Sequence, residues 1–278
     1  MKVHFTLPAL VLAICSATCA MAGPIAWGHN YQEALHTART QHKLVMVDFY
    51  TSWCTWCKHL DKVTYPSAVV QKAMQQVIPV KLNAETNGSK AAQTFHVSAY
   101  PYIAFVTPTG KLVNAIVGFE PPTPFANDIS KIVSTFTTFS KELPGLNRSL
   151  TQSPPNPKLL QNAIREYTQV CEFHKATRAA NRLKSVDYSA YPSSLEVIAE
   201  AYENIGRYGE AQPIFRQVIA KASDVNLQAQ ARVNLALTFL EQGSGGPAKN
   251  LLKEVAGNPK VSKSMRTSAL SILKEFSS

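Results

Sequence analysis

The chain has 278 residues, more than one domain usually holds, and 45% of them are hydrophobic while 17% are charged. This composition is typical of a globular protein and excludes a wholly disordered one. The formal net charge of +10 could attract acidic partners, but no run of lysine or arginine stands out, so the sequence argues against nucleic-acid binding.

The first 22 residues are typical of a secretory signal peptide. Lys2 precedes an apolar stretch over residues 5–14, and Ala20-Met21-Ala22 offers the small residues that a signal peptidase reads. The apolar stretch is shorter than the ~20 residues of a membrane span. We therefore expect residues 1–22 to be cleaved and the mature protein to be periplasmic, with a retained anchor as the alternative.

Residues 23–142 alternate between helical and extended patterns. A helix over 30–41 precedes a nearly continuous apolar run, 43–50, which is typical of a buried central strand. Further helices are expected over 54–63, 67–76, 87–95 and 123–139, and further strands over 77–82, 102–107 and 111–117. This order predicts an α/β fold with a mixed central sheet flanked by helices.

Around 143–157 the composition shifts to Pro, Gly, Asn and Ser, which indicates a linker. Residues 158–278 are predicted to be all-helical. In each of three helix pairs an aromatic residue precedes a small one by nine positions: Tyr167 and Ala176, Tyr202 and Ala211, Phe239 and Ala248. This spacing resembles tetratricopeptide repeats. Gly206 and Gly243 are expected at turns, and 259–276 as a capping helix.

Removal of the signal peptide would leave three of the five cysteines, namely Cys54, Cys57 and Cys171. Three thiols do not make a disulfide scaffold, and in an exported protein a close pair with a singleton indicates a redox-active pair. We expect Cys171, on a predicted helix, to be a buried, unreactive thiol.

The motif Trp53-Cys54-Thr55-Trp56-Cys57 follows the buried strand and begins a helix. Unpaired backbone N–H groups at a helix start favour a thiolate on the first sulfur, and the second lies one turn later. Cys54 is therefore the expected nucleophile and Cys57 the resolving thiol. A purely structural disulfide is an alternative. Zinc would need further ligands at a suitable spacing, so we expect no metal and no cofactor.

Residues 43–120 resemble a thioredoxin domain, in particular the C-terminal thioredoxin domain of the bacterial disulfide reductase DsbD. The resemblance is carried by Val-Met-Val-Asp-Phe-Tyr-Thr-Ser-Trp-Cys over 45–54, by 69–73 and by Gly118. It departs from the common pattern in Thr55-Trp56 between the cysteines. Because that dipeptide influences the reduction potential, the direction of electron flow stays open.

The resemblance also implies roles for four residues outside the cysteine pair. Asp48 falls on the family's buried acid, which would hold a raised pKa and exchange a proton with Cys57. Lys81 falls on the lysine that moderates this pKa. Pro101 falls on the cis proline beside the sulfurs, with Tyr100 presenting backbone groups to a bound peptide. A backbone-bonded Asp48 and a solvated Lys81 are the alternatives.

Two tryptophans flank the first cysteine. Trp53 and Trp56 are expected to shield the sulfurs and to offer an apolar contact for substrate, with ordinary packing as the alternative. Tyr102 stands where the family often has threonine after the cis proline.

The sequence thus favours a periplasmic thiol–disulfide oxidoreductase that reduces or isomerises protein disulfides. The helical repeats would dock a client or redox partner, and a membrane-bound or periplasmic dithiol protein would supply electrons. The alternative is a redox-sensing adaptor, in which the repeats bind a partner and the dithiol only reports the redox state.

Overall fold

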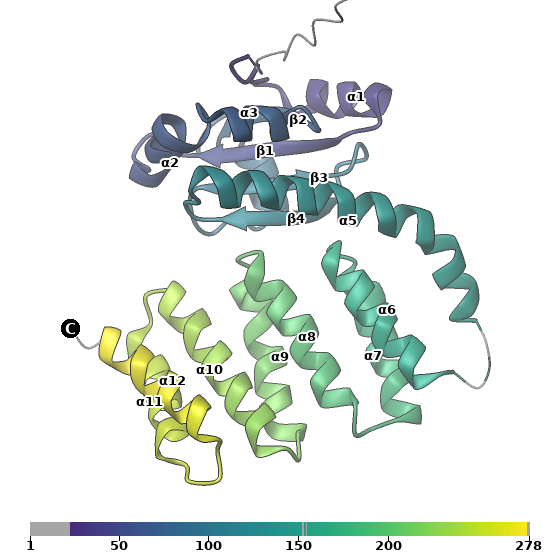
Figure 1. Cartoon of the computed structure of the whole chain (residues 1–278), viewed down its shortest axis with the longest axis vertical. Coiled ribbons are helices and arrows are strands. Elements are labelled where there is room, and N and C mark those ends of the chain that lie inside the picture. The colour runs from purple at the N-terminus through teal and green to yellow at the C-terminus, as the bar shows by residue number, and fades with distance from the viewer. Residues whose placement is uncertain (1–22, 152, 154, 277–278) are drawn as a thin grey trace, which may run out of the picture.

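The computed structural model describes residues 23–151, 153 and 155–276; the expected signal peptide lies outside the described residues. An α/β half is followed by a stack of antiparallel helices (Figure 1). The first helix, α1 (Tyr31–Gln41), begins after Asn30, whose side chain accepts hydrogen bonds from the next backbone N–H groups. This is the usual way in which an asparagine starts a helix.

A four-stranded mixed sheet lies at the centre of the first half. Its strand order is β2-β1-β3-β4, and the strands are β1 (Leu44–Tyr50), β2 (Val77–Asn83), β3 (Tyr102–Val106) and β4 (Leu112–Val117). β1 runs parallel to β2 and antiparallel to β3, and β4 pairs antiparallel with β3. β1 is buried up to its last residue because it is central, which explains its continuous apolar sequence. The predicted mixed sheet is confirmed.

The helix expected over 54–63 is divided in the structure. The segments of this region are α2 (Thr55–His59), a π-helical turn (Leu60–Thr64), α3 (Ala68–Met74) and α4 (Ser89–Thr94). In the π-helical turn the N–H of Tyr65 donates to the carbonyl of Leu60. The hydroxyl of Thr64 then donates to the backbone carbonyl of Glu120, 2.7 Å away, so the turn fastens the dithiol helix to the loop after β4.

The helix expected over 123–139 is longer in the structure: α5 (Pro122–Ser149) continues through the first part of the predicted linker, 143–157, with Pro144 inside the helix. Three leucines of this segment recur at helical spacing and pack against the main core, namely Leu143, Leu146 and Leu150. The Pro, Gly, Asn and Ser residues between them make this helical pattern difficult to recognise in the sequence. That core runs through both halves, and the division into domains 23–142 and 158–278 stays a prediction.

The helical half consists of three consecutive pairs and a terminal helix, as the spacing of aromatic and small residues predicted. The helices are α6 (Pro157–Gln169), α7 (Phe173–Val186), α8 (Tyr191–Asn204), α9 (Tyr208–Lys221), α10 (Val225–Glu241), α11 (Gly245–Gly257) and α12 (Lys263–Glu275). Gly206 and Gly243 lie in turns with φ of 71° each, a backbone conformation that favours glycine. The identity of the helix pairs as tetratricopeptide repeats stays a prediction. Across the described ranges, no helix has the length and apolar character needed to span a membrane.

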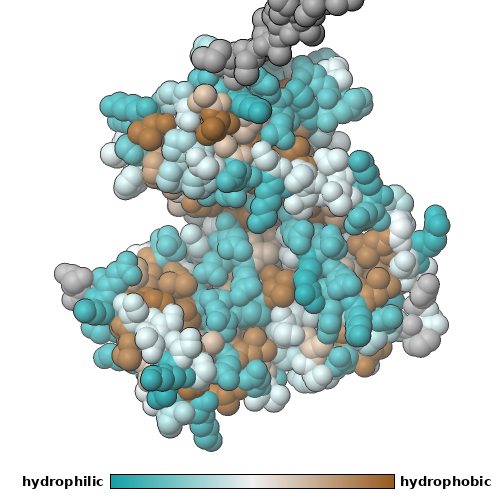
Figure 2. Space-filling model, viewed as in Figure 1, coloured by the Kyte–Doolittle hydropathy of each residue, from teal (hydrophilic) through white to brown (hydrophobic). Residues whose placement is uncertain are grey.

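The turn between α8 and α9 joins the helical stack to the sheet. The hydroxyl of Tyr102, buried on β3, donates to the carbonyl of Ile205 at 3.1 Å, and Ser98 donates to the carbonyl of Gly206 at 3.2 Å. The tyrosine at position 102 therefore contributes to the junction of the two halves. Figure 2 shows a notch between the α/β lobe and the lobe formed by α10–α12.

Candidate active site

Cys54 and Cys57 form a disulfide at the start of α2, with a Cα–Cα distance of 5.4 Å. Both residues are only 3% exposed. The backbone N–H of Cys57 donates to the sulfur of Cys54 at 3.0 Å. A donor in this position would stabilise negative charge on Cys54 after reduction, which is what a nucleophilic thiolate needs.

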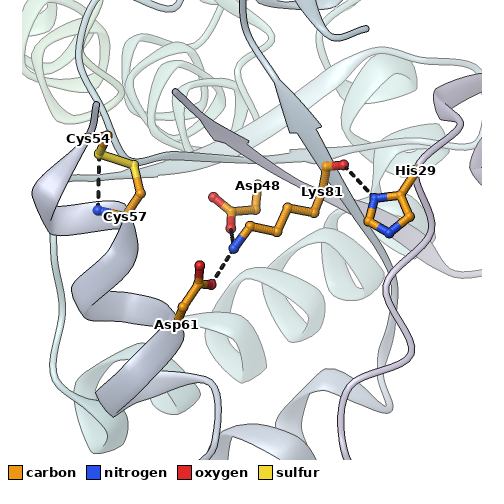
Figure 3. Close-up of polar contacts among 6 residues, drawn as sticks. All are labelled: His29, Asp48, Cys54, Cys57, Asp61 and Lys81. Atoms are coloured by element: carbon orange, nitrogen blue, oxygen red, sulfur yellow. Dashed lines mark hydrogen bonds and ion pairs between the residues drawn. A yellow bond between two sulfur atoms is a disulfide. The ribbon is translucent and has the colours of Figure 1, made fainter. Parts of the chain in front are cut away.

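Asp48 and Lys81 are brought together by the pairing of β1 with β2. They are direct partners in the register, and directly paired residues project from the same face of a sheet. The Nζ atom of Lys81 lies 3.3 Å from Oδ2 of Asp48, which is 1% exposed. Figure 3 shows the Asp48 carboxyl group between the disulfide and the Lys81 amine.

The same lysine has a second carboxylate partner that the sequence analysis did not single out. Asp61, on the π-helical turn after α2, forms an ion pair with Lys81 (Figure 3). The Nζ atom also lies 5.3 Å from the ring centroid of Tyr65, 5.4 Å from Tyr50 and 5.5 Å from Trp27, within the range of cation–π attraction. Asp61 stands four residues after Cys57, and this spacing places both on one helix face.

Burial and nearby charges together set the protonation states of Asp48 and Lys81. Burial raises the pKa of Asp48, although the positive charge of Lys81 acts in the opposite direction. Beyond Lys81, the Tyr65 hydroxyl also favours the charged form of Asp48, although it forms no well-aligned hydrogen bond with either carboxylate oxygen. Burial would lower the pKa of Lys81, but Asp48 and Asp61 outweigh it and the pKa is raised. Lys81 therefore stays a cation beside an acid that can hold a proton.

Two exposed tryptophans adjoin the cysteines in the sequence. Trp53 is 64% exposed and Trp56 57% exposed, so neither is ordinary core packing. The Nε1–H of Trp53 donates to Glu85 at 2.9 Å, and its ring meets that of Tyr100 edge-on at 5.8 Å. The ring of Trp56 lies 5.5 Å from that of Phe119, a residue that the sequence analysis missed.

The peptide bond between Tyr100 and Pro101 is cis, as the resemblance implied. Pro101 directly precedes β3, and Tyr100 contacts the Trp53 ring beside Cys54. The structure thus brings together Tyr100 and Trp53 from the predicted substrate-binding set. Their role in binding a substrate stays a prediction.

Cys171 lies away from this site, and its predicted position on a helix is wrong. It occupies the turn between α6 and α7 with φ of 54°, and the N–H groups of Cys171 and Glu172 bond back to the end of α6. Burial raises the pKa of the Cys171 thiol to about 12, which favours the protonated thiol. The residue is half-buried, not fully buried as the sequence predicted, and its lack of reactivity stays a prediction. The described part of the chain holds no cluster of three or more His, Cys, Asp or Glu side chains that could bind a metal ion.

Comparisons with known proteins agree with this geometry over the first half. Residues 26–108 match the family described as Thioredoxin-like. The thiol:disulfide interchange protein DsbD of Photorhabdus laumondii is 34% identical over 104 residues, which are 35% of this chain and 18% of that protein. A protein disulfide-isomerase of Zea mays is 33% identical over 72 residues, which are 26% of this chain and 14% of that protein.

The chain also matches solved structures over part of its length. The oxidised C-terminal domain of DsbD from Neisseria meningitidis is 22% identical, with a TM-score of 0.32, and the match covers 36% of this chain and 90% of that one. The chain spans less than a fifth of the length of the two curated relatives. Residues 26–108 therefore form a thioredoxin-like domain of the disulfide oxidoreductase type, which carries the Cys54–Cys57 pair.

Proposed function

We propose that this protein is a periplasmic thiol–disulfide oxidoreductase that reduces or isomerises disulfides in client proteins. The observation that carries the proposal is the Cys54–Cys57 disulfide at a helix start, with the buried carboxyl group of Asp48 behind it and exposed tryptophans around it. Similarity to proteins named for disulfide interchange and disulfide isomerisation supports this chemistry. The periplasmic location rests on the signal-like sequence of residues 1–22.

The first chemical step begins from the reduced pair. The Cys54 thiolate attacks one sulfur of the client disulfide, whose S–S bond breaks as a mixed disulfide with Cys54 forms. The displaced client sulfur leaves as a thiolate and takes up a proton. For isomerisation, a client thiolate attacks the mixed disulfide in turn and Cys54 leaves unchanged.

Resolution is the step in which Asp48 acts. Cys57 gives its proton to the Asp48 carboxylate and attacks the sulfur of Cys54, breaking the mixed disulfide. The second client sulfur leaves as a thiolate and is protonated. The client has then gained two electrons and two protons, and Cys54–Cys57 is left in the oxidised form that the structure holds.

Further turnover needs a dithiol electron donor, because the disulfide must be reduced again. We assign the role of donor to a membrane-bound or periplasmic dithiol protein. We also infer that the helical pairs bind either that donor or the client. The stack is bonded to the sheet through Tyr102 and Ile205, so a partner bound by the helices would be held near the dithiol domain.

The oxidoreductase proposal is tested by the reduction of insulin disulfides in the presence of a small dithiol. The purified protein should accelerate reduction, Cys54→Ser should abolish the acceleration, and Cys171→Ser should leave it intact because Cys171 lies outside the site. Equal rates for the wild type and Cys54→Ser would overturn the proposal.

The direction of electron flow is set by the reduction potential of the pair. Equilibration with glutathione buffers should give a value near about −250 mV, typical of reductants in this fold. A value near about −120 mV would assign the protein to the oxidants instead.

A redox-sensing adaptor is the second candidate, favoured by the bonded junction between the two halves at Tyr102 and Ile205. In that role a partner would bind the helical pairs with different affinity in the oxidised and reduced states. The insulin assay would then show no turnover by the wild type.

A further inference from the structure

Residues 97–101, between α4 and β3, carry the predicted client contact of Tyr100 and Pro101 and contain neither helix nor strand. We call these residues the client segment. The ring of Tyr100 meets that of Trp53 edge-on at 5.8 Å, and Trp53 directly precedes Cys54. The client segment therefore lies beside the cysteine that is expected to attack a client disulfide.

Two backbone bonds hold the ends of the client segment within the α/β half. The N–H of Val97 donates to the carbonyl of Ala92 on α4 at 2.9 Å, and the N–H of Gly118 donates to the carbonyl of Pro101 at 2.9 Å. Across the described ranges, residues 98–100 form no further backbone–backbone hydrogen bond. Because no ladder of such bonds fixes them, their position depends on side-chain contacts.

The turn between α8 and α9 supplies these contacts from the helical stack. The hydroxyl of Ser98 donates to the carbonyl of Gly206 at 3.2 Å, and the hydroxyl of Tyr102, the first residue of β3, donates to the carbonyl of Ile205 at 3.1 Å. The two donors stand on either side of residues 100–101 in the sequence, while the two acceptors are adjacent in one turn. A single turn of the stack thus fixes both flanks of the predicted client contact.

Gly206 allows this turn to approach the sheet closely, on the side of β4 (Figure 1). Its φ is 71°, and a Cβ atom at this position would lie 3.3 Å from Cγ2 of Val117 on β4. Gly243, in the turn between α10 and α11, has the same φ, but a Cβ atom there would meet nothing within 4 Å beyond its chain neighbours. The two glycines therefore share their backbone conformation, and Gly206 differs by its contact with the sheet.

We propose that the α8–α9 turn positions the client segment for binding, so that the helical stack forms part of the client-binding site. Ser98 and Gly206 are positioning residues, which act through Tyr100 and Pro101 and not on the sulfurs. This inference rests on the proposed function and gives the helical stack a task in it. A loosened client segment would be competent for binding only part of the time, so the KM for a client rises while kcat is kept.

Two substitutions loosen this contact, and each has a matched control. Ser98→Ala removes the donor to the carbonyl of Gly206. Its control is Ser193→Ala, since the hydroxyl of Ser193 donates to a carbonyl at the start of its own helix, α8. Gly206→Ala forces the turn and Val117 apart, whereas Gly243→Ala places a side chain on the same kind of backbone without such a contact.

The purified, reduced protein is assayed with a peptide that contains one internal disulfide, for which KM and kcat are measured separately. Hydroxyethyl disulfide is the reference substrate, because it has no polypeptide backbone to lie along the client segment. Binding is measured independently by fluorescence anisotropy, with the oxidised protein and a labelled peptide in which serines replace both cysteines, so that no thiol exchange occurs.

Ser98→Ala and Gly206→Ala should raise the KM for the peptide and weaken its binding about threefold to tenfold, the effect of losing one hydrogen bond. Their kcat for the peptide and their rate with hydroxyethyl disulfide should change little, because the dithiol is untouched. Ser193→Ala and Gly243→Ala should match the wild type in all of these measurements.

An unchanged KM in Ser98→Ala overturns the inference, as does an equal rise of KM in Gly206→Ala and Gly243→Ala, because the turn would then only join the two halves. Equal losses of rate with the peptide and with hydroxyethyl disulfide also overturn it, since the dithiol itself would be affected. If the wild type reduces neither substrate, the proposed function fails, and binding of the peptide to the oxidised variants still decides the inference.

Discussion

Lys81 connects two carboxylates that stand in different relations to the dithiol. Asp48 is buried and lies beside the lysine through strand pairing, whereas Asp61 comes from the turn that continues the dithiol helix. The cation stabilises the charged form of Asp48, while the negative charge of Asp61 opposes that form. Burial raises the pKa of Asp48, and the neighbouring side chains of Lys81, Tyr65 and Asp61 then adjust it, so the effect of each neighbour can be tested separately.

Asp48→Asn should slow the resolution of a mixed disulfide at neutral pH on the order of a hundredfold, the lower end of the usual contribution of a general base. The fold should be little affected, because the substitution removes a buried carboxylate whose oxygens accept no well-formed hydrogen bond from the described residues. Stopped-flow release of a labelled client peptide measures the rate, and urea unfolding measures the stability. A large loss of stability with an unchanged rate would contradict the proton-transfer role.

Asp61→Asn and Lys81→Met should shift the pKa of Asp48 in opposite directions. Removing Asp61 takes away a like charge and leaves Lys81 to Asp48 alone, so the pKa falls; removing Lys81 takes away the stabilising cation, so the pKa rises. Carbon-13 NMR titration of the Asp48 carboxyl group measures both. Lys62→Gln, on the exposed side of the same turn, is the control and should cause little shift. Shifts of the same sign in both variants would show that Lys81 does not mediate the balance.

At the scale of elements, the strands of the sheet could be predicted because β1 is continuously apolar and the last two strands are separated by a Pro-Thr-Gly turn. The continuation of α5 to Ser149 could not, because Pro144 and the neighbouring small residues conceal the leucines that pack on the core. The cysteine pair and Asp48 lie in one local motif, which the sequence displays. The π-helical turn brings Asp61 to Lys81. The packing of the loop after β4 brings Phe119 to Trp56 and the carbonyl of Glu120 to Thr64. Neither arrangement is visible in the local sequence.

The contact between β3 and the α8–α9 turn should contribute measurably to stability. Tyr102→Phe removes the donor to the carbonyl of Ile205 and leaves a buried acceptor without a partner, which costs about 1–3 kcal/mol. Chemical unfolding of both proteins gives this difference directly. Tyr188→Phe is the matched control, because Tyr188 is 53% exposed and should change the free energy of unfolding by less than about 0.5 kcal/mol. Equal effects of the two substitutions would contradict a role for the hydroxyl of Tyr102.

At the scale of the whole molecule, the glutamates of α8 couple the stability of the helical stack to pH, because they lie where neighbouring helical pairs pack against one another. Glu196 is buried and accepts a hydrogen bond from Asn234 on α10 at 2.9 Å, and Asn234 also donates to Glu200. Burial, followed by the charge of Glu200, raises the pKa of Glu196 to about 8, and the same two causes raise that of Glu203 to about 7. Sequence alone could not reveal this, since the pairing joins residues 38 positions apart.

These raised pKa values predict that the protein is more stable in mild acid than in mild base. An acid whose pKa is higher in the folded than in the unfolded state binds its proton more tightly when folded, so its contribution is complete below the unfolded value of about 4.3 and is lost as the pH rises through the folded value. The free energy of unfolding should therefore fall by several kcal/mol between about pH 5 and 8, because each unit of raised pKa corresponds to about 1.4 kcal/mol and solvent screening reduces the share of the half-buried Glu203. Urea unfolding across that range measures it.

Glu196→Gln should flatten this pH dependence, because the amide keeps the shape and the bond to Asn234 but has no proton to lose. Glu142→Gln, exposed on α5, should leave the slope as it is. Glu172 has a lowered pKa because it is bonded to Lys111 and Lys175. Its contribution to the free energy of unfolding is therefore lost only as the pH falls below the range of this window, and it does not affect the slope measured here. A stability that rises toward pH 8, or a slope that Glu196→Gln does not change, would show that the α8 acids are not protonated in the folded protein.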